Sequence, residues 1–330
     1  MFAKLINAAI DLFAKIKPKA RARVEREPKK EKPQKEASQP AAAKRAALRG
    51  GLIMPRFTLP SVGSVFLVVA LMLQLGLLGR NTYISTSSST IDWGMSYQKE
   101  GEAPIGNSSK EFLLKYGAYY IGDESRPVVY LTFDAGYENG FAETILDTLK
   151  KHNAKATFFV VKHYIDSEPD LVRRMVEEGH IVANHSSSHP DMSKMPAREF
   201  ENELESTALS YLSVTGQQMA KLYRPPSGKY SEDSLKLAQD LGYSTILWST
   251  AYADWDNNKQ PSPDSALSTL MKRTHNGAIV LLHLTSKTNS IVLDEYLSKL
   301  KANGYSFETL YDLKQWSEKA IVPNAEGGTF

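Results

Sequence analysis

Five short motifs in the chain carry side chains that can serve in acid–base or metal chemistry. In chain order they are TFDAG at 132–136, NHSSSH at 184–189, RPPSG at 224–228, ADWD at 253–256 and LLH at 281–283. Each is common by itself, because an aspartate after a strand is usually a turn or helix cap and two histidines four residues apart arise by chance. Together they supply a base, an acid, metal ligands and an oxyanion donor, which are the parts needed to hydrolyse an amide or ester.

The first two motifs hold the candidate base and the candidate metal ligands. His185 and His189 are four residues apart, a spacing that places two imidazoles on one face of a helical turn and lets both reach one divalent ion. Such an ion can polarise a carbonyl and hold a water of lowered pKa. Asp134 is the candidate general base for that water, and Arg224 would keep it ionised through a charge-assisted hydrogen bond.

The remaining motifs hold the candidate acid and the oxyanion donor. A protonated His283 can donate to a leaving nitrogen, and Asp254 can hold that imidazole and raise its pKa. In the RPPSG turn Pro226 has no N–H, so the backbone of Ser227 is the better oxyanion donor.

Seven short apolar segments, alternating with amphipathic stretches, must position these motifs. They are VVYLTF from 128, ATFFVV from 156, IVAN from 181, LYR from 222, STILWS from 244, AIVLLH from 278 and YSFETL from 305. The clearest amphipathic stretches begin at 141 and 199. Strands that alternate with helices predict parallel pairing and a sheet buried on both faces, so the fold class is α/β. We expect an incomplete (β/α) barrel of seven parallel strands in preference to an open doubly wound sheet, with its chemistry at the carboxyl ends of the strands.

The chain before this barrel divides by charge and hydropathy. Residues 1–56 hold 15 Lys or Arg against 5 Asp or Glu, and 57–79 hold no charged residue. Because a bilayer core needs about 20 apolar residues in a helix, we expect a transmembrane helix at 57–80 after a disordered basic cytoplasmic tail at 1–56. A cleaved signal peptide is the alternative, and no small-x-small site follows the apolar run.

The expected transmembrane helix also determines how we divide the rest of the chain into domains. We expect an extracytoplasmic stalk at 81–125, a catalytic domain at 126–320 and a short tail at 321–330. The protein is then a single-pass protein of the cell membrane, with its N-terminus in the cytoplasm and its catalytic domain outside.

Composition excludes several classes of function. The chain has no cysteine, which excludes disulfides, thiolate metal sites and cysteine nucleophiles. Residues 57–330 hold 25 Lys or Arg (40 minus 15) against 32 Asp or Glu (37 minus 5), so the body of the protein gives no reason to expect nucleic acid as a partner. The oligomeric state stays open.

The ordered motifs resemble those of the polysaccharide deacetylase family, also called the NodB-homology or carbohydrate esterase 4 group, over about residues 126–320. The resemblance implies a distorted barrel of seven strands, with Asp134 as the catalytic base and Arg224 as the residue that positions it. It implies that His185 and His189 bind a metal, that Asp254 tunes the acid His283, and that Trp255 helps to form the acetyl pocket. Tyr137 is a further aromatic candidate for stacking on a sugar.

Within that family, the segments 119–140, 163–193 and 224–235 are similar to delta-lactam-biosynthetic de-N-acetylases of endospore formers. This likeness implies hydrolysis of the acetamide of N-acetylmuramic acid residues that have lost their peptide. The product amine can then close onto the lactyl carboxylate as muramic δ-lactam, a component of spore cortex. Peptidoglycan glycan strands and the membrane are the implied partners.

One position departs from the family pattern. Most members have a second aspartate after the first, which completes a metal triad, and this chain has Ala135 there. We therefore expect a divalent metal (Zn, Co or Mn) that two histidines hold weakly. Three alternatives remain. The first is hydrolysis without a metal, driven by Asp134, and the second is a non-catalytic glycan-binding membrane protein with a degenerate metal site. The third is a deacetylase that acts on N-acetylglucosamine polymers or on an O-acetyl ester.

Overall fold

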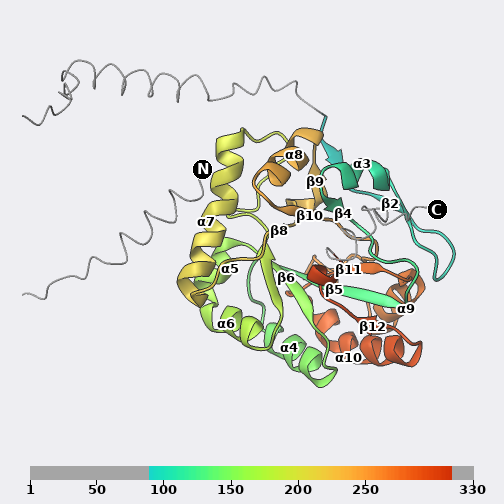
Figure 1. The fold of residues 1–330 in the computed structure, drawn as a ribbon. Coiled ribbons are helices and arrows are strands. Elements are labelled where there is room, and N and C mark those ends of the chain that lie inside the picture. The colour runs from blue at the N-terminus through green and yellow to red at the C-terminus, as the bar shows by residue number, and fades with distance from the viewer. Residues whose placement is uncertain (1–88, 314–330) are drawn as a thin grey trace, which may run out of the picture. The chain divides into compact units, whose positions relative to one another are not determined.

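The computed structural model describes residues 89–313, which form a curled parallel sheet with helices packed around its outer face (Figure 1). The strands of this sheet are β4 (Ala118–Tyr119), β5 (Val128–Ala135), β6 (Ala156–Val160), β7 (Ile181–Asn184), β8 (Leu222–Tyr223), β10 (Ser244–Ile246), β11 (Ala278–His283) and β12 (Ser306–Phe307). The helices are α3 (Lys110–Lys115), α4 (Ala142–Lys151), α5 (Lys162–Ser167), α6 (Pro169–Glu177), α7 (Ala197–Thr215), α8 (Glu232–Asp240), α9 (Pro263–Arg273) and α10 (Lys287–Ala302). Short strands β1 (Ile91–Asp92), β2 (Met95–Ser96), β3 (Ile105–Gly106) and β9 (Lys229–Tyr230) and the 3-10 turn η1 (Pro226–Gly228) complete the described elements.

All pairs within the main sheet are parallel. The strand order is β11-β5-β6-β7-β8-β10-β4, and β12 pairs with the start of β5. Beyond β10 the chain returns to β11, where Thr250 forms a parallel bridge with Val280. The sheet is therefore curled and meets itself locally, as in an incompletely closed barrel. The seven strands predicted from sequence are all present, and β4 is an eighth that the sequence did not indicate.

Alternation along the strands decides which side chains reach the interior of the curled sheet. On β5, Val128 and Tyr130 belong to an inner apolar cluster, whereas Phe133 belongs to the cluster beneath the helices. Side chains along a strand point alternately to the two faces of the sheet. Asp134 therefore lies on the inner face, in the row of Val128 and Tyr130 that we call the inner stripe. Ala135 lies on the outer face with Phe133, in the outer stripe. Ala135 is accordingly fully buried in the cluster beneath the helices.

The same alternation serves the other strands that carry predicted site residues. Ile279 of β11 belongs to the inner cluster and Val280 to the outer one, so His283 falls on the inner side. On β7, Ala183 belongs to the inner cluster, so the same parity carries His185 inward just past the strand end. On each of these strands the inward-facing side chains are mostly apolar, and the one nearest the carboxyl end is a polar residue of the site.

The helices that cover the outer face follow their amphipathic patterns. On α4, Ile145, Leu146 and Leu149 are fully buried against the outer side of the sheet. α7 ends at Gly216, whose φ of 71° is a left-handed cap that glycine adopts without strain. Both helices were predicted from the sequence. In Figure 1 α7, α6, α4 and α10 form an arc around the strands.

The stalk expected at 81–125 is wrong for its described part, residues 89–125. β4 lies in the main sheet beside β10, and β1 pairs antiparallel with β9. Trp93 is buried, and its Nε1 donates to the carbonyl of Trp248 at 3.0 Å. The many Ser, Gly and Asn residues of this segment suggested a linker, but its few large apolar side chains are enough to fix it on the barrel. The folded unit therefore begins before Arg126.

Three predicted segments lie wholly or partly outside the described residues. These are the basic tail at 1–56, the transmembrane helix at 57–80 and the end of the chain from 314, including the tail at 321–330. Within residues 89–313, no helix is long and apolar enough to cross a membrane.

Candidate active site

A cleft at the carboxyl ends of the strands gathers the predicted side chains. Its volume is about 920 Å³. The predicted residues that line it are Asp134, Tyr137, His185, His189, Ser227, Trp255 and His283. Arg224 and Asp254 have no exposed surface, and each is hydrogen-bonded to a residue of the cleft wall. The structure therefore brings all of the predicted site residues together.

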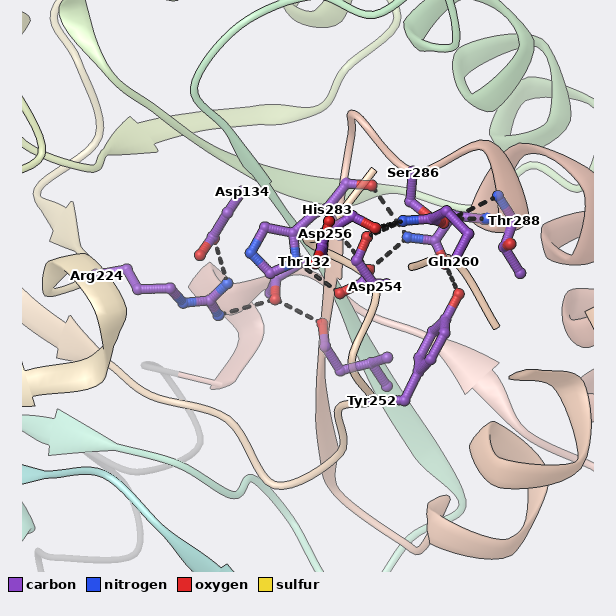
Figure 2. Close-up of polar contacts among 12 residues, drawn as sticks. Thr132, Asp134, Arg224, Tyr252, Asp254, Asp256, Gln260, His283, Ser286 and Thr288 are labelled. Atoms are coloured by element: carbon purple, nitrogen blue, oxygen red, sulfur yellow. Dashed lines mark hydrogen bonds and ion pairs between the residues drawn. The ribbon is translucent and has the colours of Figure 1, made fainter. Parts of the chain in front are cut away.

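The candidate base at the end of β5 is held by a buried arginine. Arg224 Nη1 donates to Asp134 Oδ1 at 2.7 Å, and Nη2 donates to Thr132 Oγ1 at 2.8 Å (Figure 2). Burial raises the pKa of Asp134, but the charge and hydrogen bond of Arg224, together with the nearby His283 imidazole, outweigh it and hold that pKa below its usual value. Asp134 is therefore a carboxylate at neutral pH, the form that a general base requires.

The candidate acid at the end of β11 is held by a buried carboxylate. His283 Nδ1 donates to Asp254 Oδ1 at 2.7 Å, and the backbone N–H of His283 donates to Oδ2 at 2.7 Å (Figure 2). Asn289 Nδ2 also donates to Oδ2, at 2.6 Å. Burial lowers the pKa of His283, but the Asp254 carboxylate and its hydrogen bond more than compensate, so that pKa is raised. Because Nδ1 is engaged, Nε2 is the nitrogen available to the cleft.

Base and acid face each other across neighbouring strands. Asp134 and His283 are register partners on β5 and β11, and both continue inner stripes. Adjacent strands lie about 4.8 Å apart, so the backbone hydrogen bonds set the spacing of this pair. An ionised carboxylate beside a protonated imidazole can take a proton from a nucleophile and give one to a leaving group.

The two candidate metal ligands come together through a loop rather than the helical turn that the sequence suggested. Residues 185–189 have no helix, because Ser186 and His189 have φ values of 69° and 57°. The rings of His185 and His189 nevertheless lie edge to face, with centroids 4.8 Å apart. The loop is anchored from α7, where the Glu203 carboxylate accepts the N–H groups of Ser187 at 2.9 Å and Ser188 at 2.8 Å.

Both imidazoles are in the neutral form that ligates metals. His185 Nδ1 lies 2.9 Å from the carbonyl of Arg224 and must carry the proton, so Nε2 holds the lone pair. Burial lowers the pKa of His185 to about 4 and also lowers the pKa of His189. His185 Nε2 lies 3.6 Å from Asp134 Oδ2, so the lone pair of the neutral imidazole lies close to a negatively charged carboxylate, which is unfavourable. A cation between or beside these groups would relieve that arrangement, so the chemistry of the donors fits a divalent metal.

The protein supplies few ligands for such an ion. Among residues 89–313, no group of three or more His, Asp or Glu side chains is arranged so that it could hold a metal ion. Ala135 has no ligating atom, and its methyl group lies on the outer stripe of β5. The expectation of a weak site held by two histidines therefore stays a prediction.

The remaining predicted residues form the walls of the cleft. Ser227 lies in η1 with a left-handed φ of 55°. Trp255 is 61% exposed, and its ring centroid lies 6.4 Å from that of His283. Tyr137 is 49% exposed, and its hydroxyl accepts a hydrogen bond from Asn257 Nδ2 at 2.8 Å. Exposed aromatic faces at the mouth of a polar cleft are suited to stacking on sugar rings.

The sequence analysis missed several lining residues with polar side chains, among them Tyr97, His163 and Arg273. Tyr97 belongs to the segment expected as a stalk, His163 follows β6, and Arg273 is the last residue of α9. The position of His163 just past a strand end was a usable signal in a β/α fold. Tyr97 and Arg273 carry no such signal, because a basic residue in the last turn of a helix is ordinary.

Comparisons with known proteins agree with this geometry. The model of the polysaccharide deacetylase family matches residues 121–246. The peptidoglycan-N-acetylmuramic acid deacetylase PdaA of Bacillus subtilis is 41% identical over 224 residues, which cover 68% of this chain and 85% of PdaA. The peptidoglycan-N-acetylglucosamine deacetylase of Bacillus cereus is 32% identical over 209 residues, which cover 62% of this chain and 74% of that protein.

Solved structures share the fold. The structure of Bacillus subtilis PdaA, a family 4 carbohydrate esterase, superposes with a TM-score of 0.67 at 39% identity, over 70% of this chain and 98% of that chain. A family 4 pseudoenzyme from Bacillus anthracis superposes with a TM-score of 0.56 at 32% identity, over 59% of this chain and 68% of that chain. The chain belongs to the polysaccharide deacetylase family, carbohydrate esterase family 4, and is a hydrolase of the acetamide carbon–nitrogen bond of carbohydrates.

Proposed function

We propose that this protein removes the acetyl group from N-acetylmuramic acid residues of peptidoglycan. The observation that carries the proposal is the meeting of the Asp134–Arg224 and His283–Asp254 pairs at one rim, in a chain 41% identical to an N-acetylmuramic acid deacetylase. Glycan strands that have lost their peptides are the expected substrate. The amine released beside the lactyl group can then close to muramic δ-lactam, which would place the protein in the formation of spore cortex.

In the proposed reaction the two pairs act in sequence. Asp134 accepts a proton from the water that attacks the acetyl carbonyl, and Arg224 stabilises the carboxylate before and after that transfer. His283 donates from Nε2 to the sugar nitrogen as the carbon–nitrogen bond breaks, and Asp254 stabilises the protonated imidazole until then. The backbone N–H of Ser227 is the proposed donor to the oxyanion.

A divalent ion is part of the proposal, with His185 and His189 as its protein ligands. When bound, it would polarise the acetyl carbonyl as a Lewis acid. Two ligands should hold Zn²⁺, Co²⁺ or Mn²⁺ loosely, so we expect dialysis to remove it. Equilibrium dialysis with radioactive zinc checks this: binding should disappear in His185→Ala, and binding that survives in His185→Ala would contradict this ligand assignment.

Release of acetate tests the function itself. The full chain in detergent is incubated with peptide-free glycan strands in EDTA or with each of the three metals, and the products are assigned by mass spectrometry after muramidase digestion. We expect acetate and muramic amine, both lost in Asp134→Asn. No acetate with any metal, with glycan binding intact, would favour the non-catalytic alternative. Acetate from glucosamine residues alone would contradict the muramic substrate.

Anchoring in the cell membrane is a separate part of the proposal, supported by the uncharged segment at 57–79 that follows a basic tail. Because the chain has no cysteine, single cysteines can report topology without background. We expect an impermeant maleimide to label Ile291→Cys, a site that is 52% exposed, on intact cells. Ser38→Cys should react only after lysis, and labelling of both in intact cells would contradict the orientation.

A further inference from the structure

One arginine of the cleft wall has no charged partner. Arg273 is half-buried at the end of α9, and its guanidinium carbon lies 3.9 Å from the centroid of the Tyr97 ring. Its Nη1 donates to the carbonyl of Ala251, which also accepts from the Tyr97 hydroxyl at 3.3 Å. Within residues 89–313, no carboxylate lies within ion-pair distance of Arg273. A guanidinium has five N–H donors, and the Ala251 carbonyl engages one of them.

The base and the acid of the cleft each have a buried partner of opposite charge. The Asp134 carboxylate is paired with Arg224, and the His283 imidazole is paired with Asp254. Among the described residues that line the cleft, Arg273 is the only lysine or arginine. The cleft wall therefore carries one positive charge, at Arg273, that has no carboxylate partner among the described residues, and the Tyr97 ring packs against it.

This charge matches the group that separates the two candidate sugars. N-acetylmuramic acid differs from N-acetylglucosamine by a lactyl ether on O3, next to the acetamide, and the lactyl carboxylate is ionised at neutral pH. Arginine binds carboxylates through two parallel N–H···O bonds, and an aromatic ring beneath the guanidinium keeps its plane fixed.

We propose that Arg273, braced by Tyr97, binds the lactyl carboxylate and selects muramic acid over glucosamine residues. The inference rests on the proposed function, since it requires that muramic residues enter the cleft. Tyr97 and Arg273 both lie outside residues 121–246, the part matched by the family model. Selection of the sugar is thereby assigned to segments that flank the matched part.

A purely structural role is the competing explanation. Arg273 could serve to hold the segment around Tyr97 against the loop after β10, in which case its loss would impair every substrate alike. The experiment must therefore separate recognition of the carboxylate from maintenance of the fold. Methyl esterification of the lactyl group does this, because it removes the charge from the substrate and leaves the sugar otherwise unchanged.

The test compares the full chain in detergent with its Arg273→Gln variant on peptide-free glycan and on the same glycan esterified at the lactyl groups. For the parent we expect kcat/KM to be about 10- to 100-fold higher on the free acid, mainly through KM. Arg273→Gln should lose this preference by losing activity on the free acid while keeping the parent's activity on the ester. Arg273→Lys should retain part of the preference. Arg198→Gln, an exposed arginine on α7, is the matched control and should behave as the parent.

Two results would overturn the inference while leaving the proposed function intact. One is an equal loss on acid and ester in Arg273→Gln, which would show a structural role. The other is an unchanged preference for the free acid in Arg273→Gln, which would show that another group binds the lactyl carboxylate. A parent that releases acetate only from glucosamine residues would overturn the proposed function itself, and this inference with it.

Discussion

Replacement of Asp254 by asparagine isolates the electrostatic part of the acid. The Asp254 carboxylate is fully buried and accepts three hydrogen bonds of 2.6–2.7 Å, two from His283 and one from Asn289. Asparagine keeps the shape but removes the charge, so that burial, which lowers the pKa of His283, is no longer opposed. A hydrogen bond to a charged partner contributes about 1.5–3 kcal/mol. At 1.36 kcal/mol per pKa unit, we expect the pKa of His283 to fall by about 1–2 units.

The assay is a pH–rate profile of acetate release between pH 4 and 10. The alkaline limb of kcat/KM reports loss of the protonated acid, so in Asp254→Asn it should move down by about 1–2 pH units. Activity should therefore fall by about 10- to 100-fold at pH 8 and by less at pH 5. Asp256→Asn, the same change two residues away, is the control and should leave the profile unchanged. An alkaline limb that stays in place or moves up would refute the assignment of His283 as an acid tuned by Asp254.

Stability provides an independent check of the same pair. The folded pKa of His283 lies above its ordinary value of 6.5. The stability that this shift contributes is therefore fully present below about pH 6.5 and is lost as pH rises through the raised pKa. The difference in melting temperature between parent and Asp254→Asn should shrink from pH 6 to pH 9. A difference that grows over that range would contradict the sign of the shift.

Three further substitutions test other parts of the site. Arg224→Met leaves the Asp134 carboxylate buried without a partner, so the free energy of unfolding in urea at pH 7 should fall by about 3–5 kcal/mol; a loss below about 1 kcal/mol would contradict the role of this pair. Ala135→Asp places a carboxylate on the fully buried outer stripe of β5, so in EDTA it should be less stable to urea by at least about 2 kcal/mol, and equal stability would show that residue 135 can face the cleft. Glu203→Ala removes the acceptor that anchors the loop of His189, so we expect kcat/KM to fall about 10-fold. Glu203→Gln should retain most of the activity because its amide oxygen can still accept, and equal activity in all three proteins would remove Glu203 from the positioning of the loop.

The sequence predicted the framework well because the relevant strands are long and fully buried. The six residues of β11 are apolar up to the final His283, and the eight residues of β5 are apolar apart from Thr132 and Asp134, the next-to-last residue. β4 was not predicted, because a strand of two residues, Ala118–Tyr119, is too short to show a periodic pattern and lies in a stretch rich in small polar residues. The stalk was predicted wrongly for the same reason, since a few buried side chains such as Trp93, Leu113 and Tyr116 fix a segment that composition describes as a linker.

The site was predicted to a similar degree. Its strand-end residues were found because each motif follows an apolar run, and parallel strands bring such ends to one rim. The helical turn for His185 and His189 was wrong, because the spacing of two histidines says nothing about the left-handed backbone at Ser186. The contact between Arg273 and Tyr97 could not be predicted, because it depends on how α9 packs against a segment more than 170 residues earlier in the chain.

The backbone pairing of β5 with β11 has a consequence for redesign of this enzyme. Backbone pairing of the two strands sets the distance between Asp134 and His283. Loops at the mouth that carry neither Asp254 nor Arg224 can therefore be exchanged without disturbing the reacting pair. Conversely, insertion of one residue into β5 would rotate Asp134 to the helix side and destroy turnover while leaving the mouth intact. Substrate choice and bond cleavage can therefore be altered separately in this scaffold.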